Sequence, residues 1–466
     1  MVRSGDGSVR MKSGDWKHLP WPRGWIRPFV ARWLLFGALK RPRPDYLLEC
    51  WRFPRVEYAP ESGINAGLPQ GNHEPDLLFL PMTDWHARFQ RTQHLACGLA
   101  EAGHRCFYVN PHLGFQFPGL CERPPRHAIT RLAPRLFEFH ARLPWEPVVH
   151  QRMPMSSETR ILQDALLRLL EAAGVFRMVQ IVSLPFWLDL CKRIRDLLGF
   201  PIVYDCHDWL GGFHRIGRSI VESEGELLRC CDAVLFSSKP LLDRMASAYP
   251  GLCEKALLLR NAASPAPRSY TNHAESGQRP SGTARVVGYI GALDHWFDFE
   301  AIRSAARLKP DWHFVLIGRI EDRRIESLTG LPNVRFLGEV PHRQIGEYIR
   351  RFDVGLIPFL KNELTEAANP IKLYEYFAYG LPVVSADLPE VRPFKDLVYL
   401  YQGAPDFLNA LDAAAGESRL ELRDRRIAAA AAETWENRVR ALQDLLQHLI
   451  QQARLKTRSG PSSLQT

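Results

Sequence analysis

Lys372 and Glu375 stand three residues apart, a spacing that brings an ammonium and a carboxylate to one face of a helix. An ammonium in the first turn of a helix adds its charge to the free N–H groups and the positive end of the helix dipole, which together favour phosphate. A carboxylate one turn further along suits the hydroxyl groups of a ribose behind the phosphates. The spacing therefore indicates a nucleotide site, although a solvated Lys372–Glu375 pair on an exposed helix would have the same spacing.

A helix with defined ends must position these two side chains, and the stretch NPIKLYEYFAYGLPVVSAD (369–387) predicts one. Asn369 is a good N-cap, and Pro370 suits the first helical position because the N–H group that proline lacks would have no partner there. Gly380 supplies a left-handed stop, and the β-branched run after it predicts a buried strand. We therefore expect Asn369, Pro370 and Ile371 to form a helix start that helps to bind the anion.

Short apolar runs alternate with amphipathic stretches from about residue 75 onward, which predicts parallel sheets covered by helices on both faces. A polar stretch rich in proline, serine and glycine separates a first series of runs from a second. The expected strands are the runs at 76–81, 106–110, 178–184, 202–206, 233–238 and 255–261 in the first series, and at 285–293, 313–318, 334–338, 354–359 and 382–386 in the second. The predicted fold class is α/β, with two doubly wound Rossmann-like domains that face each other across a cleft. The predicted organisation is a basic N-terminal segment (1–70), a first domain (71–263), a linker (264–284), a second domain (285–416), a helical segment (417–455) and a disordered tail (456–466).

Ligands in such sheets bind beyond the carboxyl ends of the strands, where several informative residues fall. In the second domain Gly291 and Arg319 follow the first two predicted strands, and a glycine there lets the backbone approach a phosphate closely. In the first domain Asp205, His207 and Asp208 end or follow the run at 202–206. We expect His207 and Asp208 to take part in catalysis. His207 could equally be a hydrogen-bonded histidine on the rim of the site, without a chemical role.

The start of the first predicted helix in the first domain carries a second group of polar and aromatic residues. Trp85, Arg88, Arg91 and Gln93 are placed to meet a substrate on the acceptor side, together with Asp205. A structural Arg91 that pairs with a local carboxylate is an equal alternative. The glycine fingerprint of dinucleotide-binding domains, GxGxxG, is absent, so a dinucleotide cofactor is not supported.

The positive charge of the chain is concentrated in its first 44 residues. These residues carry ten basic side chains against two acidic ones, so they account for +8 of the formal net charge of +9. A nearly neutral folded part argues against nucleic-acid binding, which needs a basic stripe on a domain. The same segment holds Trp16, Trp21, Trp25 and Trp33, and this mixture of cations and aromatics suits an anionic membrane surface. The alternative is a disordered arm with an accidental tryptophan cluster.

The cysteines and the hydropathy of the chain indicate its compartment. Nine cysteines are scattered mostly in apolar runs without a CxxC pair, which indicates buried thiols in a reducing compartment and no metal site. No stretch approaches the roughly 20 apolar residues of a spanning helix, and no secretory signal precedes a cleavage site. We expect a cytoplasmic protein that attaches peripherally to the inner face of the cytoplasmic membrane.

Several stretches resemble one known family. NPIKLYEYFAYGLPVVSAD, preceded by VRFLGEVPHRQIGEYIRRFDVGLIPF, resembles the C-terminal domain of the retaining glycosyltransferases of family four, which have the GT-B fold. GYIGALDHWFDFEAI and RTQHLACGLAEAGHRCFYVNP are similar to the bacterial subgroup typified by teichuronic acid biosynthesis enzymes. The resemblance covers roughly residues 76 to 450, and its most specific part is 285 to 390.

The resemblance implies roles for single residues. It implies that Glu375 binds the ribose of the donor as the second glutamate of an E-x7-E pair, and that Lys372 holds the diphosphate with Arg319. Eight residues before Glu375 stands Ala367 instead of a glutamate, so the contact to the donor sugar would come from Glu366, Glu363 or a backbone group. The loop after the first strand of the second domain, ALDHWFD, also lacks the usual arginine and lysine, which leaves Lys372 as the main cation.

The implied activity is transfer of a sugar from a nucleotide diphosphate sugar to a saccharide or lipid-linked acceptor, with retention and in cell-surface polysaccharide biosynthesis. A helix end plus Lys372 would stabilise the leaving diphosphate without a metal, and no cofactor beyond the nucleotide sugar is expected. Two alternatives remain: a nucleotide-sugar epimerase, which would need an acid and a base on both sides of the sugar, and a catalytically silent nucleotide-sugar-binding scaffold, which the missing glutamate would favour.

Overall fold

The structure is a computed structural model that describes residues 74–86, 88–113, 127–145, 147–264 and 284–458, together with Leu68 and Gly71. These residues belong to one compact unit, Val56–Thr466. The N-terminal segment up to residue 67, nearly all of the linker and the tail from residue 459 lie outside the described residues. What the sequence predicts for them, including membrane contact and disorder, stays a prediction.

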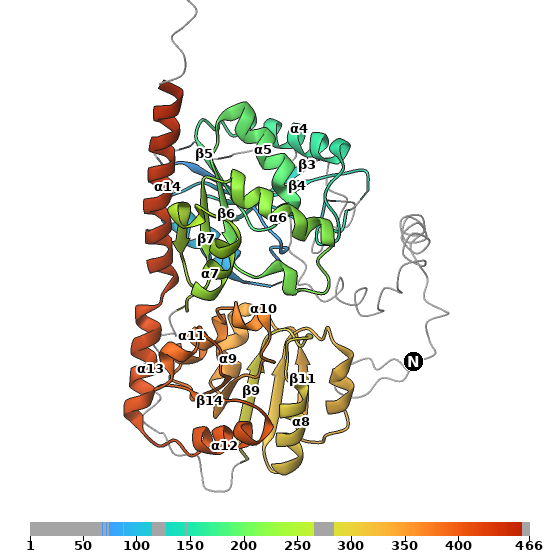
Figure 1. The fold of residues 1–466 in the computed structure, drawn as a ribbon, viewed down its shortest axis with the longest axis vertical. Helices are drawn as coiled ribbons and strands as arrows, with labels where there is room; N and C mark the ends of the chain where they lie inside the picture. Colours follow the sequence, from blue (N-terminus) through green and yellow to red (C-terminus); the bar gives the residue numbers. More distant parts are fainter. Residues whose placement is uncertain are drawn as a thin grey trace, which may run out of the picture. The chain divides into compact units, whose positions relative to one another are not determined.

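The first sheet has eight strands in the order β3-β4-β2-β1-β5-β6-β7-β8 (Figure 1). All neighbouring strands are parallel except β3 and β4, which form an antiparallel pair at one edge. The strands are β1 (Asp76–Leu80), β2 (Cys106–Val109), β3 (His127–Ala133), β4 (Leu136–Ala141), β5 (Met178–Val182), β6 (Ile202–Cys206), β7 (Ala233–Phe236) and β8 (Ala256–Leu258).

Helices cover both faces of the first sheet. One apolar cluster joins Leu77 and Phe79 of β1 to α3 and α14 (Trp435–Arg458), and a second joins Leu78 and Leu80 to the helices of the opposite face. This alternation is the period of two that a buried parallel strand shows on its two faces. The helices are α3 (Arg91–Glu101), α4 (Ser156–Ala172), α5 (Leu188–Leu198), α6 (Arg218–Cys230) and α7 (Lys239–Ala248).

The second sheet has six parallel strands in the order β11-β10-β9-β12-β13-β14. The strands are β9 (Val286–Ile290), β10 (His313–Ile317), β11 (Val334–Gly338), β12 (Val354–Ile357), β13 (Val383–Ala386) and β14 (Tyr399–Tyr401). Its helices are α8 (Phe299–Leu308), α9 (Ile345–Ile349), α10 (Glu363–Glu366), α11 (Ile371–Ala378) and α12 (Ala404–Ala415). The predicted class, two doubly wound α/β domains, is confirmed.

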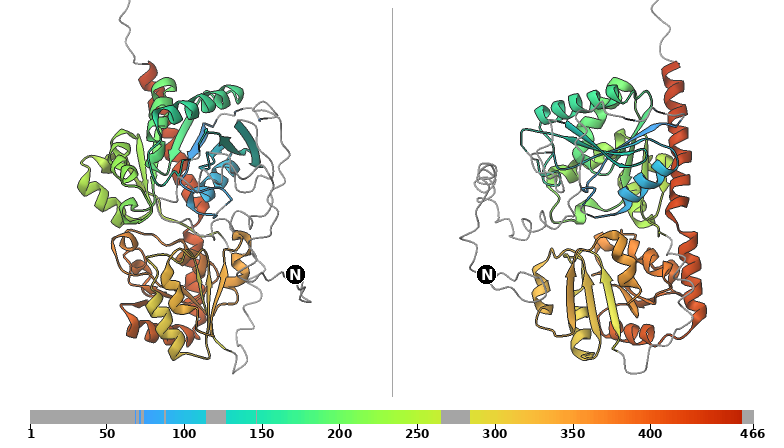
Figure 2. Two further views of the ribbon diagram at one scale, coloured as in Figure 1. Left: turned by 90° about the vertical axis from the view of Figure 1, so that its right-hand side faces the viewer. Right: turned by 180° about the vertical axis from the view of Figure 1, so that it is seen from behind.

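The C-terminal helical segment corrects one prediction. The expected stretch of residues 417–455 is two helices, α13 (Leu420–Ala432) and α14 (Trp435–Arg458). The chain leaves the helix at Thr434, which forms a bridge with Ala263. Because of this break, α13 packs on α11 in the second domain while α14 packs on α3 in the first, and Figures 1 and 2 show the two helices beside different domains. None of the described helices is both long and apolar enough to cross a membrane.

The sequence pattern did not predict three of the strands, β3, β4 and β14. β3 and β4 come from HAITRLAPRLFEFHA, where charged residues interrupt the apolar pattern, and β14 is only three residues long. In β4 the polar residues that break the apolar run are buried and paired, because Glu138 contacts both His86 and His140.

Candidate functional site

Lys372 and Glu375 contact each other in the first turns of α11, with Nζ 2.5 Å from Oε2. The pair is not the solvated one that the sequence left open, because the two side chains are 21% and 11% exposed. His342 Nε2 lies 3.6 Å from the other oxygen of Glu375. Burial acts to raise the pKa of Glu375, but the charge and hydrogen bond of Lys372 and the nearby His342 imidazole outweigh it and lower the pKa to about 2. Glu375 is therefore ionised at neutral pH.

The start of α11 differs from the prediction. Pro370, not Asn369, is the N-cap, and Asn369 makes no capping bond. Its side-chain oxygen instead accepts from the backbone N–H of Asn261 at 2.9 Å, and its amide donates to Tyr374 and to Glu390 at 3.0 and 2.9 Å. Asn369 is thus wrong as a cap, because its buried amide groups are used to join the two sheet domains. Gly380 has φ +66 and ends the helix as predicted.

Helix α3 of the first domain lies against this part of the second. The His94 ring packs 5.2 Å from the His342 ring and stacks on Trp435 at 4.5 Å, and Phe89 packs on both histidines. Burial, followed by the charges of His342 and Lys372, lowers the pKa of His94 to about 3, against the opposing charge of Glu375. His94 is therefore a neutral histidine at neutral pH, close to the Lys372–Glu375 pair.

Two glycines bring the ends of β9 and β10 into close backbone contact. Gly318 has φ +144, a conformation that L side chains rarely adopt, and a Cβ atom there would lie 1.9 Å from the carbonyl oxygen of Gly291. Only glycine fits position 318 without moving the backbone. Gly291 itself donates its N–H to Ile317 at 2.8 Å, so this group belongs to the sheet rather than to a free phosphate loop.

A buried polar group lies at the carboxyl end of the first sheet. Arg91 Nε donates to both carboxylate oxygens of Asp205 at 2.9 and 3.2 Å, and Arg91 Nη1 donates to Asn261 at 3.3 Å. Arg91 and Asp205 are only 2% and 1% exposed. Arg91 does pair with a carboxylate, as one alternative held, but that carboxylate lies 114 residues away and is not local. Because Asn261 also bonds Asn369, this group adjoins the start of α11.

His207 lies beside this group, between two aspartates. Its Nδ1 is 3.0 Å from the Asp205 carbonyl oxygen, and its Nε2 is 3.7 Å from a carboxylate oxygen of Asp208. Loss of hydration raises the pKa of Asp208, and the charges of His207 and Arg91 only partly offset this. The structure thus brings the predicted catalytic pair His207 and Asp208 together, and their role in catalysis stays a prediction.

Arg319 and Arg88 belong to a separate ion-pair cluster. Arg319, Arg88 and Arg215 all contact the carboxylate of Glu321, and Arg88 also donates to Glu339 at 2.9 Å. Arg215 further donates to the Glu321 carbonyl oxygen at 2.6 Å, so the cluster joins the first domain to the second. Arg319 therefore has a partner of its own, and its predicted contact with the diphosphate would require it to leave Glu321.

The displaced acidic position lies on α10. Glu366 is half-exposed and has Lys361 Nζ 3.8 Å from its carboxylate. Ala367, where the family pattern has glutamate, is 2% exposed and packs in the apolar cluster of the first domain. Its carbonyl oxygen also accepts from Ser238 Oγ at 2.5 Å. A glutamate at 367 would bury its carboxylate among apolar side chains, which explains why alanine stands there.

Trp85 and Gln93 have structural contacts. The Trp85 ring packs edge-on against Tyr108 at 5.0 Å and against Phe89 at 5.9 Å. Gln93 is fully buried, and its amide donates to the carbonyl oxygens of Arg88 and Asp84. Gln93 therefore fixes the loop before α3 and does not face a substrate, contrary to expectation.

Sequence reasoning missed the residues that join the two domains here. His94 lies in a stretch that resembles the family, but nothing in that stretch pointed to a contact with the second domain. Asn261 stands in no recognisable motif, and Glu390 joins Arg260, Asn369 and the backbone N–H of Lys239 only in three dimensions. His342 had a weak signal, because it follows a strand and a glycine turn in the stretch that resembles the family.

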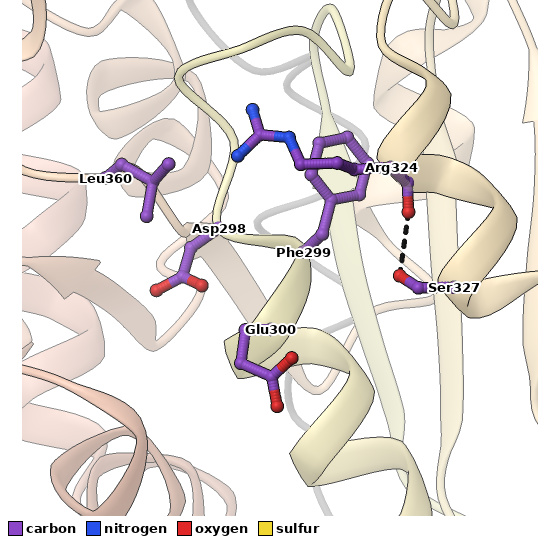
Figure 3. Close-up of a pocket in the computed structure, with 6 residues that line it drawn as sticks. All are labelled: Asp298, Phe299, Glu300, Arg324, Ser327 and Leu360. Carbon is purple, nitrogen blue, oxygen red and sulfur yellow. Dashed lines mark hydrogen bonds between the residues drawn. The ribbon is translucent and has the colours of Figure 1, made fainter.

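A small pocket lies elsewhere in the second domain. It has a volume of about 260 Å³ and is lined by Asp298, Phe299, Glu300, Arg324, Ser327 and Leu360 (Figure 3). The Arg324 guanidinium lies over the Phe299 ring at 5.2 Å, and Ser327 Oγ donates to the Arg324 carbonyl oxygen at 2.7 Å. None of the predicted site residues lines this pocket. In the described part of the chain, no group of three or more histidine, cysteine, aspartate and glutamate side chains is arranged to hold a metal ion.

Comparison with known families decides what the second domain is. Residues 284–412 match the family model of the glycosyl transferases group 1. They form a group 1 glycosyl transferase domain. This range contains α11 with Lys372 and Glu375, together with both glycines at the ends of β9 and β10.

A curated relative and two solved structures extend this finding. The chain is 28% identical over 236 residues to the putative teichuronic acid biosynthesis glycosyltransferase TuaH of Bacillus subtilis, and the match covers 47% of this chain and 59% of that protein. Anabaena HepE in complex with UDP and glucose has a TM-score of 0.56 at 15% identity, over 80% of this chain and all of its own. The α,α-trehalose 6-phosphate synthase of Burkholderia multivorans has a TM-score of 0.57 at 16% identity, over 84% of this chain and all of its own. These likenesses establish the GT-B fold.

Proposed function

We propose that this protein is a retaining glycosyltransferase that moves a sugar from a nucleotide diphosphate sugar to a saccharide or lipid-linked acceptor in cell-surface polysaccharide biosynthesis. The observation that carries the proposal is the Lys372–Glu375 pair at the start of α11, inside the group 1 domain and against α3 of the first domain. The match to a putative teichuronic acid enzyme supports the polysaccharide setting. HepE, which has the same fold, was solved with UDP and glucose, so UDP-glucose is the first donor to test.

In the proposed reaction the bond from the anomeric carbon to the diphosphate oxygen breaks, and the carbon bonds to an acceptor hydroxyl oxygen. The proton of that hydroxyl passes to the leaving diphosphate. Lys372 and the N–H groups of the first turn of α11 stabilise the charge that develops on the leaving group, so we propose that no metal is needed. Glu375 accepts hydrogen bonds from the ribose, and a side chain such as Glu366 contacts the sugar.

The roles on the first domain follow from position. His207 and Asp208 lie beside the junction with α11, where a donor sugar would project. Arg88 is one-third exposed and lies on the same edge of the sheet, where an acceptor would approach. Trp85 and the buried Arg91–Asp205 pair lie behind these residues and shape the acceptor side.

The test is incubation of the purified protein with labelled UDP- and GDP-sugars, with and without membrane lipid extract. Label on a lipid or saccharide product supports the proposal, and the anomeric configuration of that product by NMR decides retention. An epimerised donor would make the protein an epimerase, and binding without turnover would make it a scaffold. A chelator should leave the rate unchanged if no metal takes part.

The proposed membrane attachment has its own test, because residues 1–44 carry most of the net charge. Each basic side chain near an anionic surface contributes about 1 kcal/mol, and salt screens this attraction. Full-length protein should sediment with anionic liposomes at low salt and be released at high salt, whereas a chain without residues 1–44 should stay in solution. Equal sedimentation of the two chains would show that this segment is not the anchor.

A further inference from the structure

Two buried hydrogen-bond donors without a partner come from neighbouring elements at the carboxyl end of the first sheet. Among the described residues, Arg91 and Ser183 are each only 2% exposed, and the atoms Arg91 Nη2 and Ser183 Oγ have no hydrogen-bond partner. A buried donor without an acceptor costs about 1–3 kcal/mol, so such a group calls for an explanation.

The strand register places these two groups together. Val182 of β5 pairs with Tyr204 of β6, so Ser183 and Asp205 are the next neighbours along the two strands, which lie about 4.8 Å apart. Val182 and Tyr204 pack on the face away from α3, so the residues that follow them point to the face that α3 covers. Arg91, the first residue of α3, binds Asp205 from the side of the sheet that α3 covers.

The contacts of Arg91 fix its guanidinium and leave one amino group available. Nε is held by Asp205 and Nη1 by Asn261, while Nη2 has no acceptor. Other cations at the junction differ in this respect: Lys372 contacts Glu375, and Arg260 contacts Glu390. Arg135 also has buried nitrogens without a partner, but it lies in the β3–β4 turn at the opposite edge of the sheet.

The position of this donor pair indicates its ligand. Asn261 links Arg91 directly to Asn369, the residue before the N-cap of α11, so the pair borders the proposed diphosphate site. It also lies at the N-terminal end of α3, an 11-residue helix whose dipole adds positive potential. A guanidinium N–H and a hydroxyl that converge at a positive helix end are donors for an anionic oxygen.

We propose that Arg91 Nη2 and Ser183 Oγ bind a phosphoryl oxygen at the junction of the two domains. This rests on the proposed glycosyltransferase function and adds a contact from the first domain to a ligand otherwise held by α11. The phosphoryl group belongs either to the diphosphate of the donor or to a phosphorylated acceptor. Both sources present the same oxygen chemistry, and the experiment separates them.

The deciding variant is Ser183→Ala, because a hydroxyl without a partner contributes nothing to the folded state that alanine would lose. Its melting temperature without ligand should equal or exceed that of the wild type, while its affinity for the phosphoryl ligand should fall about tenfold. Ser385→Ala is the matched control: that hydroxyl is equally buried but donates to the Ala386 carbonyl oxygen at 2.8 Å. The control should lose stability and keep its affinity.

Calorimetry with UDP, GDP, the matching monophosphates and inorganic phosphate identifies the source. If the donor supplies the oxygen, Ser183→Ala weakens the binding of the nucleoside diphosphates more than the binding of the monophosphates. If the acceptor supplies it, affinity for the diphosphates is unchanged, but binding of inorganic phosphate to the UDP- or GDP-saturated protein is lost. Arg91→Lys, which keeps a cation opposite Asp205 but removes Nη2, should reproduce either pattern.

Two results would overturn the proposal. If the wild type binds UDP or GDP and neither variant alters any phosphoryl ligand, the donors hold only a buried water and the proposed function still stands. If the wild type binds none of the nucleotides and no phosphate, the proposed function fails together with this inference.

Discussion

Two ion pairs lie near the junction of the domains, and they differ in the sequence separation and burial of their partners. Lys372–Glu375 is formed within a single helix by residues three apart, and both side chains keep some exposure. Arg91–Asp205 joins α3 to β6 across 114 residues, and both side chains are buried. The first pair can exchange one partner for a ligand, whereas the second cannot separate without leaving a buried charge.

The difference indicates that the first pair is suited to bind a ligand and that the second holds parts of the fold in position. A partly exposed lysine with one carboxylate partner can turn to a phosphate at lower cost than a buried arginine, because its ammonium keeps some contact with water. The Arg91–Asp205 pair instead fixes β6 and α3 relative to each other, and so sets the position of His207 two residues later. Variants of Lys372 and Glu375 should therefore change ligand affinity, whereas removal of Asp205 should change stability.

The largest expected effect is on the buried pair. Asp205→Ala leaves the Arg91 guanidinium buried without its carboxylate and should lower the free energy of unfolding by about 3–5 kcal/mol. Urea denaturation measures this. Asp243→Ala, which breaks the exposed Lys239–Asp243 pair, is the control and should cost less than about 0.5 kcal/mol. A similar loss in both variants would contradict the distinction.

The second effect is on the Lys372–Glu375 pair. Lys372→Ala should weaken binding of the nucleoside diphosphate by about 1.5–3 kcal/mol, because it removes a charge-assisted contact, and should change stability by less than about 1 kcal/mol. Lys192→Ala is the control variant, because Lys192 also contacts a glutamate, Glu226, at 2.5 Å. Calorimetry with UDP and GDP on both variants measures the difference. Unchanged affinity in a folded Lys372→Ala protein would remove the diphosphate assignment.

The third effect concerns the other partner of that pair. Glu375→Gln keeps helix propensity but loses the charged acceptor, so it should weaken binding of the ribose-bearing nucleotide by about 1.4 kcal/mol, or tenfold. The loss should be smaller for the 2′-deoxy and 3′-deoxy forms, which lack a ribose hydroxyl. If the variant discriminates between ribose and deoxyribose as the wild type does, Glu375 does not bind the sugar ring.

The smallest effect is a pH dependence that His94 adds beside the pair. The pKa of His94 in the folded protein, about 3, lies below its ordinary value of 6.5, so folding opposes protonation of this imidazole. The free energy of unfolding is therefore highest above pH 6.5 and falls as the pH drops from 6.5 toward 3. Between pH 7 and pH 5.5 this amounts to about 1 kcal/mol. Urea denaturation of wild type and His94→Gln at the two pH values measures it, and the variant should lose less stability. Equal losses would show that His94 titrates normally.

The sequence by itself determined the elements that are set by local pattern. Continuous apolar runs predicted eleven of the strands in their places, because a strand buried on both faces has a composition that can be read locally. The Lys372–Glu375 spacing and the Gly380 stop were readable for the same reason, since both depend on residues within one helix.

Only the tertiary structure decided what those residues contact across domains. Asn369 has the local signature of a helix cap, yet Asn261, Tyr374 and Glu390 use its hydrogen-bonding groups instead. Arg319 follows a strand as a phosphate ligand would, yet Glu321 binds it together with Arg88 and Arg215. Tyr374 and Glu321 are near in sequence, but Asn261, Arg88 and Arg215 come from distant parts of the chain, and a buried polar group bonds whichever partner the packing brings nearest. The local pattern therefore predicted where the candidate site lies, and the packing of the two domains decided which contacts its residues make.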